Sequence, residues 1–519
     1  MKRALILTIG LVFMHFSAIA QLTEQQQIQK LNYVYQQLRN NYVDDVPLEP
    51  LVEEAIKATL KQLDPHSTYL SREQIDQMRT RLRGAYAGIG IKYIIHNDTV
   101  VVRSIMPNSP AERAGIAPND RIVAIDGRNV VGIPIDSVAS LFRGEVNTSL
   151  NIEVARRVWF FHETITVRRK SIDNSAISTS FRVGNVGYIS VSAFSKPVAS
   201  EFYAAYRSLG DVEALIVDLR NNSGGAITSA IDLTGLFLKK GDVIVSTEGR
   251  SHNIVYDKRE DGAIIDIPIV VIINENSASA SEIFAGAIQD HDRGVIVGHT
   301  SFGKGLVQEI IDLKDGSALC LTIARYKTPS GRIIQRPYTL GGNDDYIADS
   351  LRYMHPDSIA HDSKLMYTTL KLGRKVYGGG GITPDVYIDN SSINLSDKLL
   401  EAYAQAVFEH TDIDIWDCTS NYGLFLQYDN VDKFDTGYKI SDRIMELFYR
   451  NANLEAEELT EFDQQFITTM IKATMAERLY GEWARYYIYN KHLDPMAQRA
   501  VEIAKDNTLY EQILNSMGK

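Results

Sequence analysis

The chain has 519 residues, and its 54 lysine and arginine side chains against 65 aspartate and glutamate side chains give a formal net charge of −11. At about 100–200 residues per domain, this length predicts roughly three to five folded units. The 45% apolar share with 23% charged residues excludes a largely disordered or fibrous chain. The acidic balance disfavours nucleic acid as a partner, because nonspecific binding needs clustered lysine and arginine. The sequence has two cysteines, Cys320 and Cys418, which excludes a disulfide-stapled scaffold and a cysteine-based zinc site.

The first twenty residues, 1–20, predict an export signal that is removed from the mature protein. Lys2 and Arg3 precede an apolar run over residues 4–14, and the small residues of Ala18-Ile19-Ala20 offer a cleavage site. The run is too short to span about 30 Å of hydrocarbon, and no cysteine follows it to carry a lipid anchor. A buried N-terminal helix or strand is the weaker alternative. We expect an exported protein that is soluble after cleavage, with the bacterial periplasm as its destination.

Hydrophobic periodicity divides the rest of the chain into four predicted regions. Residues 21–83 have helical spacing, residues 84–170 read as short strands, residues 171–390 alternate strands with helices, and residues 391–519 are mostly helical. Such alternation implies an α/β layered domain with crossover connections. Residues 336–377 read as an insertion in that domain, either a functional element or a solvated loop. The C-terminal region has no chemical motif, and its sequence does not decide between dimerisation, docking of an adaptor protein and packing on the core.

A glycine-containing loop opens the second of these regions. It comprises Gly88, Ile89, Gly90 and Ile91, and further motifs follow it in order: Ser109-Pro110-Ala111, Ala114-Gly115-Ile116 and a strand and turn from Asp120 to Gly127. This succession resembles a PDZ domain. PDZ domains bind a peptide C-terminus as an added strand, and backbone N–H groups of such a loop hold its carboxylate. Glycines let the backbone approach the anion. An unrelated β-rich module whose glycines only form turns is the alternative.

The first candidate for chemistry is the string Arg-Asn-Asn-Ser-Gly-Gly at residues 220–225, which follows a predicted buried strand. Its Asn-Ser-Gly-Gly part resembles the nucleophile motif of trypsin-like proteases. That arrangement needs a catalytic histidine and aspartate ahead of the PDZ-like region, where only a short helical segment is present. We interpret the string as a glycine-rich turn at the carboxyl end of a strand, where backbone N–H groups can face an anionic intermediate.

The second candidate is a run of alternating serines, Ser277, Ser279 and Ser281, between a predicted buried strand and a helix expected over residues 283–289. A serine at a strand-to-helix turn is exposed, and adjacent backbone amides can bind an oxyanion. The spacing alone does not say which serine is the nucleophile. Ser277 has a simpler alternative role as the N-cap of the helix.

The third candidate is Lys304, which lies between two glycines and enters a predicted strand in which positions 304, 306 and 308 share a face. A lone lysine is usually a solvated surface charge. In apolar surroundings, however, its pKa falls, and the neutral amine can take a proton from a serine. Gln308 could then hydrogen-bond the amine and fix its direction.

Taken together, these strings resemble the carboxyl-terminal processing peptidases, the tail-specific serine proteases of peptidase family S41. The resemblance extends from Leu63 to about Ile388 and includes further ordered strings at residues 63–70, 324–332 and 380–385. It implies a multidomain α/β fold. The expected parts are a PDZ domain, an α/β layered, crotonase-like protease core, and helical N- and C-terminal segments.

The resemblance also implies roles for individual residues. In the Ser/Lys dyad of the family, Ser279 corresponds to the nucleophile, Lys304 to the general base and Gln308 to the residue that orients the lysine. The oxyanion would be held by the backbone N–H groups of Ala280 and Gly225, the latter in preference to the glycine before it.

Asp290 falls where some members of the family have an acidic residue once assigned to catalysis, and we expect a structural contact at a helix end instead. The resemblance implies no metal and no other cofactor. The run Asp290-His291-Asp292 reads as a polar turn, since no His-Glu-x-x-His motif occurs in the chain. A metalloenzyme is therefore a weak alternative.

The implied function is hydrolysis of peptide bonds through an acyl-enzyme, in proteins or peptides that present an exposed, apolar C-terminus to the PDZ domain. A second copy of the chain and an adaptor protein are the further partners considered. The alternative function is that of a catalytically inactive PDZ adaptor that binds protein C-termini. The combination of Ser279, Lys304 and Gln308 argues against it, because folding alone does not demand these three residue types together.

Overall fold

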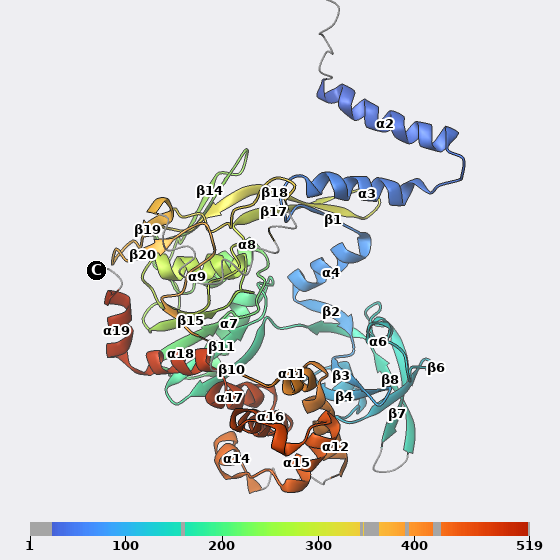
Figure 1. The fold of residues 1–519 in the computed structure, drawn as a ribbon, viewed down its shortest axis with the longest axis vertical. Helices are drawn as coiled ribbons and strands as arrows, with labels where there is room; N and C mark the ends of the chain where they lie inside the picture. Colours follow the sequence, from blue (N-terminus) through green and yellow to red (C-terminus); the bar gives the residue numbers. More distant parts are fainter. Residues whose placement is uncertain are drawn as a thin grey trace, which may run out of the picture.

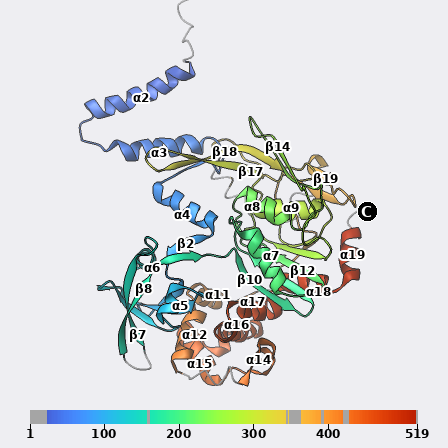
Figure 2. The same ribbon diagram turned by 180° about the vertical axis from the view of Figure 1, so that it is seen from behind.

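The computed structural model describes residues 23–156, 161–342, 346, 363–389, 394–418 and 427–516. The predicted export signal and the central part of the predicted insertion lie outside these ranges. In the described part of the chain, no helix is both long enough and apolar enough to cross a membrane. Figure 1 shows the fold coloured from blue to red along the chain, and Figure 2 shows it from behind.

The N-terminal segment consists of three helices and one short strand. Helix α2 (Glu24–Asn41) extends away from the body of the molecule and buries none of its residues (Figure 1). Helix α3 (Leu48–Lys61) and strand β1 (Thr68–Leu70) lead to helix α4 (Arg72–Arg83). Strand β1 pairs antiparallel with β18 (Ala318–Lys327), so this segment is joined to the predicted protease core.

The PDZ-like region is an antiparallel sheet with its own hydrophobic core. Its strands lie in the order β3 (Ile91–His96), β4 (Thr99–Ile105), β5 (Arg121–Ile125), β7 (Ser149–Arg156) and β8 (Phe161–Arg168), with β6 (Arg128–Asn129) beside β5. The other elements are α5 (Pro110–Ala114), α6 (Ile135–Phe142) and the paired strands β2 (Ala85–Gly88) and β9 (Lys170–Asp173). Leu150, Ile152 and Val154 alternate along β7 and are buried, as a period of two requires. Among the described residues, β3 is an edge strand of this sheet.

The predicted protease core contains a six-stranded sheet whose central strands are parallel. The strand order is β10 (Ile177–Val183), β11 (Val186–Val191), β12 (Ala214–Asp218), β15 (Ile269–Ile273), β16 (Val295–Gly298) and β21 (Val386–Tyr387). The pairs from β11 to β21 are parallel, whereas β10 runs antiparallel to β11. Every residue of β12, β15 and β16 is buried, so both faces of the sheet are covered. The predicted α/β layered fold is confirmed.

Helices from two distant parts of the chain cover the two faces. One layer consists of α7 (Val198–Ser208), α8 (Ile227–Thr234) and α9 (Ala280–Asp290); the other consists of α17 (Glu482–His492), α18 (Pro495–Lys505) and α19 (Asn507–Ser516). Along β12, Leu215 and Val217 pack with the first layer, and Ala214 and Ile216 pack with the second. The C-terminal region therefore packs on the core and forms one of its layers.

A smaller sheet lies beside the first. Its strand order is β1, β18, β13 (Val243–Gly249) and β14 (Ile254–Asp257), and β17 (Leu306–Asp312) also pairs with β18. In the β17–β18 hairpin, Gln308 is the register partner of Thr322. Because β1 pairs with the same β18, the N-terminal segment lies close to the strand that carries Gln308.

The C-terminal region also contacts the PDZ-like region. Before α17 it contains α11 (Asp397–Ala404), α12 (Val407–Cys418), α14 (Val431–Gly437), α15 (Asp442–Ala452), the short 3-10 helix η5 (Ala456–Glu458) and α16 (Glu461–Tyr480). Helices α12 and α16 lie near strands β3 and β4 (Figures 1 and 2), and polar contacts join them. The Arg103 guanidinium pairs with Glu477 at 2.7 Å, and the Nδ1 atoms of His96 and His410 are 2.7 Å apart. The C-terminal region thus contacts both the core sheet and the PDZ-like region and holds the two side by side.

The described part of the predicted insertion is packed rather than solvated at its C-terminal end. It contains the 3-10 helix η3 (Ser363–Leu365) and the paired strands β19 (Met366–Thr368) and β20 (Lys375–Tyr377). Arg374 is almost fully buried and forms ion pairs of 2.6 Å with both Asp292 and Asp385. A loop in solvent would not bury an arginine with two carboxylates, so this end belongs to the core.

Candidate active site

The strand-to-helix connection after β15 contains the predicted nucleophile. Helix α9 begins at Ala280, three residues before the expected start, and Ser279 is its N-cap residue. Ser277 is therefore not the N-cap. Ser279 has φ of 55° and ψ of −110°, a region that side-chain-bearing residues rarely occupy and that is found at functional turns.

The three alternating serines differ in exposure and in hydrogen bonding. Ser277 and Ser281 are fully buried, and their hydroxyl groups donate to the backbone carbonyl oxygens of Leu219 and Asn222, each at 2.8 Å. Ser279 is partly exposed. Of the three hydroxyl groups, the one on Ser279 is therefore accessible to a substrate, a distinction that the serine spacing could not make.

A buried carboxylate joins the Ser279 turn to the loop that carries Lys304. Glu282 Oε2 accepts hydrogen bonds from the backbone N–H groups of Ser279 at 2.8 Å and Lys304 at 2.9 Å. Its Oε1 accepts from the Gly303 N–H at 2.7 Å and from the Ser301 hydroxyl at 2.6 Å. Burial raises the pKa of Glu282 to about 7, although these hydrogen bonds favour the ionised form. One oxygen atom thus brings the backbones of the predicted dyad together.

Sequence reasoning missed Glu282, and a signal for it was present. Serine followed three residues later by glutamate is the pattern of a helix capping box, in which the acid bonds the backbone N–H of the cap residue. Here the same acid also reaches the glycine–lysine loop more than twenty residues away, which no local pattern predicts.

Lys304 is partly buried and has a defined partner. Its Nζ donates to Gln308 Oε1 at 2.7 Å, and Gln308 Nε2 donates to the backbone carbonyl of His66 at 2.5 Å. The two residues do not share a strand face as predicted, because β17 begins at Leu306 and its register shifts between Val307 and Gln308. Burial lowers the pKa of Lys304, and the charges of Cys320, Glu282 and Asp64 offset part of that shift. The surroundings therefore favour the neutral amine that a general base requires.

Tyr326 provides a second link between the two segments. Its buried hydroxyl lies 3.1 Å from the Ser279 carbonyl oxygen and also contacts the Lys304 carbonyl oxygen. Gly303 has φ of 85°, and a Cβ there would lie 2.5 Å from Arg336 Cγ. Glycine is therefore required for the lysine loop to approach this site.

The glycine-rich string forms a turn that abuts the Ser279 turn. The Gly224 N–H donates to Asn222 Oδ1 at 2.9 Å, so it is already engaged. A Cβ on Gly224 would lie 2.9 Å from the Ala280 nitrogen and 2.8 Å from Ser279 Cβ, which only glycine avoids. Among the described residues, the N–H groups of Gly225 and Ala280 have no acceptor. These two N–H groups are the ones available to an anion beside Ser279.

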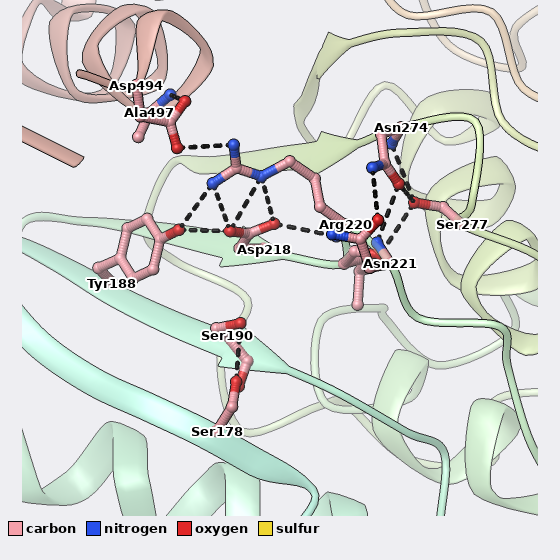
Figure 3. A network of polar contacts seen from close by, with 11 residues as sticks. Ser178, Tyr188, Ser190, Asp218, Arg220, Asn221, Asn274, Ser277, Asp494 and Ala497 are labelled. Atoms are coloured by element: carbon pink, nitrogen blue, oxygen red, sulfur yellow. Dashed lines mark hydrogen bonds and ion pairs between the residues drawn. The ribbon is translucent and has the colours of Figure 1, made fainter. Parts of the chain in front are cut away.

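Arg220, at the start of this string, links the strand end to the C-terminal layer (Figure 3). Its Nη2 pairs with Asp218 Oδ2 at 2.8 Å, and its Nη1 pairs with Asp494 Oδ2 at 2.6 Å. Tyr188 donates its hydroxyl to the same Asp218 carboxylate. Asp494 is the N-cap of α18, where it also accepts the Ala497 N–H at 3.0 Å. The last helices of the chain are thereby fixed next to the glycine turn.

Figure 3 also shows how the two loops at the strand ends are tied together. The Asn221 N–H donates to Asn274 Oδ1 at 2.9 Å, and Asn274 Nδ2 donates back to Asn221 Oδ1 at 3.0 Å. The glycine turn and the serine turn are therefore held together by two hydrogen bonds.

Asp290 lies at the opposite end of α9 from Ser279. Its fully buried carboxylate pairs with Arg332 Nη2 at 2.7 Å and accepts the Ser330 N–H at 2.9 Å. A helix of eleven residues is about 16 Å long. The structure therefore does not bring Asp290 to Ser279.

The predicted peptide-binding loop lines a groove of about 200 Å³ in the PDZ-like region. Its lining residues are Tyr86, Gly88, Ile89, Gly90, Ile91, Tyr93, Ala139, Phe142 and Arg143. Gly90 has φ of 79°, and a Cβ there would lie 2.4 Å from Ser109 Cβ, so the loop needs glycine at this position. The groove lies between the edge strand β3 and helix α6, and its lining combines the apolar side chains of Ile89, Ile91 and Phe142 with the charged side chain of Arg143.

A larger cavity, about 760 Å³, separates the PDZ-like region from the core sheet. Lys92, Tyr93 and Ile94 of β3 line one side, and helices α16, α17 and α18 line another. Asn221 and Asn274 contribute the carboxyl ends of the core strands. The crevice at the carboxyl ends of parallel strands is where ligands of α/β proteins usually bind.

Known proteins resemble this chain along most of its length. The peptidase family S41 model matches residues 185–346, a PDZ-domain model matches residues 101–156, and a model of the activating protease CtpB N-terminal domain matches residues 14–74. The carboxy-terminal-processing protease of Bartonella bacilliformis is 37% identical over 319 residues, which are 60% of this chain and 73% of that protein. The chain belongs to peptidase family S41. It also contains a PDZ domain, as the match to the PDZ-domain model indicates.

Two further proteins are also similar to this S41 protease. The carboxy-terminal processing protease CtpA of Bacillus subtilis is 32% identical over 317 residues, which are 60% of this chain and 68% of that protein. A solved structure titled photosystem II D1 C-terminal processing protease is 24% identical and covers 69% of this chain and 88% of its own, with a TM-score of 0.35. The S41 match contains Gly225, Ser279, Lys304 and Gln308, whereas the PDZ match begins after residues 88–91.

The side chains of the polar run at residues 291–292 are engaged in protein contacts. No group of three or more histidine, cysteine, aspartate and glutamate side chains within the described ranges is placed to hold a metal ion. His291 Nε2 lies 2.7 Å from the Val243 carbonyl oxygen, and Asp292 pairs with Arg374. Cys320 is a buried free thiol on β18, and the Cys418 side chain lies outside the described part.

Proposed function

We propose that this S41 protease is an exported serine endopeptidase in which Ser279 is the nucleophile, Lys304 the general base and Gln308 the residue that orients the lysine. The observation that carries the proposal is the pair of hydrogen bonds from the Ser279 and Lys304 N–H groups to a single oxygen of Glu282. The partial burial of Lys304, which lowers its pKa, and its bond to Gln308 support the role of base.

The proposed reaction needs no cofactor. Neutral Lys304 takes the proton of the Ser279 hydroxyl as its oxygen attacks the peptide carbonyl carbon, and the oxyanion accepts hydrogen bonds from the Gly225 and Ala280 N–H groups. Lysine then gives the proton to the leaving amine. In deacylation, neutral Lys304 takes a proton from a water molecule whose oxygen attacks the acyl carbon, and it returns that proton to the Ser279 oxygen as the ester bond breaks. One oxyanion donor is typically worth about 3–4 kcal/mol, so the geometry of the Gly225 turn matters nearly as much as the dyad.

We further propose that the PDZ domain selects the substrate by its C-terminus. An extended tail would add to the open edge of β3, its carboxylate would bind the loop at Gly88, Ile89, Gly90 and Ile91, and an apolar last side chain would enter the groove against Phe142. The cavity between β3 and the core strands would accommodate the upstream part of the tail.

The competing function is an inactive PDZ adaptor. It predicts tail binding without hydrolysis, and the accessible Ser279 beside a partly buried lysine favours the enzyme. The proposed reaction needs neither a second copy of the chain nor an adaptor protein, and either would be a partner in addition to the substrate.

The test uses protein isolated from the periplasm of an expressing bacterium, with the mature N-terminus expected at Gln21. Ser279→Ala and Lys304→Ala should each abolish cleavage of a protein that ends in an apolar tail, with an unchanged circular dichroism spectrum. Full activity in either variant would refute the dyad.

Ser223→Ala is the matched control. Ser223 is exposed in the Asn-Ser-Gly-Gly string and would be the nucleophile in the trypsin-like interpretation. The proposal predicts that this variant keeps its activity. Amidation of the substrate's C-terminus should raise KM and leave kcat unchanged if the PDZ loop binds the carboxylate.

A further inference from the structure

A turn in the N-terminal segment, residues 64–67, lies next to the proposed base. Asp64 Oδ1 accepts hydrogen bonds from the N–H groups of His66 and Ser67, both at 2.9 Å, and Asp64 Oδ2 accepts one from the Ser67 hydroxyl at 2.6 Å. Asp64 and Ser67 are buried. An aspartate that bonds the backbone two residues on fixes the path of a turn, so the peptide groups of this turn have set directions.

The same turn is bonded to strand β18. Thr322 donates its backbone N–H to Ser67 Oγ and its hydroxyl to Asp64 Oδ1, both at 3.1 Å. Thr322 is also the register partner of Gln308 in the β17–β18 hairpin. The turn therefore has a fixed position over the strand pair that carries Gln308.

One carbonyl group of the turn determines which end of the Gln308 amide faces Lys304. Gln308 Nε2 donates to the His66 carbonyl oxygen at 2.5 Å, and its Oε1 accepts from Lys304 Nζ at 2.7 Å. A carbonyl oxygen can only accept a hydrogen bond, so it binds the NH₂ end of the amide and leaves the oxygen for the lysine. The His66 ring takes no part in this contact, since its Nε2 lies 3.2 Å from the Tyr346 hydroxyl.

We propose that the Asp64–Ser67 turn is the positioning element of the lysine base: through the His66 carbonyl it holds Gln308 with Oε1 toward Lys304 Nζ. Asp64 is a positioning residue, because it touches no reacting atom. Its charge also raises the pKa of Lys304, and Asp64→Asn separates this effect from positioning because it removes the charge and keeps the Oδ1 acceptor. The proposal rests on the Ser/Lys dyad proposed above. It makes the N-terminal segment part of the apparatus that aligns the dyad.

A double-mutant cycle in the full chain tests this proposal. It combines Asp64→Ala with Gln308→Ala and measures kcat and KM of each protein on a peptide with an apolar C-terminus. We expect Asp64→Ala to lower kcat about tenfold, with KM unchanged, because a small misplacement of the base slows the chemical step. In the Gln308→Ala background it should add nothing, since residues that act through one another are not additive. An equal loss in both backgrounds, or an unchanged kcat in Asp64→Ala alone, would overturn the proposal.

Two further variants make the result specific. Asp64→Asn keeps the Oδ1 acceptor and should recover most of the lost kcat. Asp315→Ala is the matched control and should leave kcat unchanged, because Asp315 closes a similar turn between β17 and β18 by accepting the Ser317 N–H at 2.9 Å and the Ser317 hydroxyl at 2.6 Å.

Folding of each variant is measured by thermal melting. If Asp64→Ala does not fold, Ser67→Ala replaces it in the same cycle, because that change removes the Ser67 hydroxyl from both the Asp64 and the Thr322 contacts. Failure of the dyad itself would be recognised separately, as retained activity in Ser279→Ala.

Discussion

The two ends of helix α9 each carry an acid that is inaccessible to solvent, in different surroundings. At the N-terminal end, Glu282 accepts hydrogen bonds from three backbone N–H groups and one hydroxyl. At the C-terminal end, Asp290 pairs with the buried guanidinium of Arg332. The first acid joins two segments that meet only at the site, and the second neutralises one charge inside the core.

This difference separates alignment from stability. The partners of Glu282 are neutral, so its proton can come and go without leaving a partner charge unpaired, and burial raises its pKa to about 7. Loss of the Asp290 carboxylate would leave the Arg332 charge buried with no counter-charge beside it. We therefore expect changes at the first end to act on catalysis and changes at the second end to act on folding.

The largest expected effect is on stability, at the Asp290 end. Asp290→Ala should lower the free energy of unfolding by about 3–5 kcal/mol, because removing one partner of a buried ion pair strands the other charge. The rate per folded molecule should stay unchanged. Urea unfolding measures the free energy of unfolding. The rate per folded molecule is the rate of peptide hydrolysis divided by the concentration of active sites, which titration with a fluorophosphonate measures.

The control for this variant is Lys398→Ala, which breaks an exposed ion pair with Glu458 and should leave the urea midpoint unchanged. A loss of kcat in Asp290→Ala at normal stability would contradict the structural role and return Asp290 to the catalytic site.

The next effect is on catalysis, at the Glu282 end. Glu282→Gln should lower kcat/KM about 100-fold, equivalent to about 2.7 kcal/mol, because an amide offers one acceptor oxygen and a donating NH₂ group where four donors converge. Peptide hydrolysis and the rate of Ser279 labelling both measure it. Glu309→Gln, a change at an exposed glutamate on β17, is the control for loss of a charge and should have no effect. Near-normal labelling in Glu282→Gln would mean that the shared carboxylate does not align the dyad.

The smallest effect is a pH dependence with opposite signs for stability and activity. Because the folded-state pKa of Glu282 is raised to about 7 from an ordinary value of 4.5, its contribution to stability is full below that ordinary value and is lost as pH rises through 7. Between pH 6 and pH 7 this loss amounts to about 1 kcal/mol. Activity should rise over the same range, because ionised Glu282 and neutral Lys304 both become more populated.

Urea unfolding of wild type against Glu282→Gln isolates the stability term, since glutamine does not titrate. As pH rises, the free energy of unfolding of the wild type should fall relative to that of the variant. A constant difference from pH 5 to pH 8 would mean that Glu282 does not titrate in this range.

Much of the fold and part of the site followed from local sequence patterns. The uninterrupted apolar runs of β12 and β15 predicted strands buried on both faces, and the string at residues 220–225 predicted the glycine-rich turn that lies beside Ser279. The family resemblance supplied the dyad, and its assignment to Ser279 and Lys304 stays a prediction. The helical character of the C-terminal region was also predicted, but not its place.

The rest depended on contacts between residues far apart in the chain. The amphipathic pattern of α18 shows that one face is buried, but it does not say that this face covers β12 and β15. In the same way, a glutamate three residues after a serine predicts a cap, but not a bond to Lys304.

The composition and net charge excluded broad classes of protein, and the ordered sequence motifs determined the family. Sequence could do this because backbone conformation and strand burial depend largely on neighbouring residues. Only the tertiary structure decided which serine is accessible, which glycine N–H is unengaged and which acid joins Ser279 to Lys304. Accessibility and hydrogen-bond partners are properties of the space between segments. That space exists only after β15, β17 and the Asp64 turn have come together.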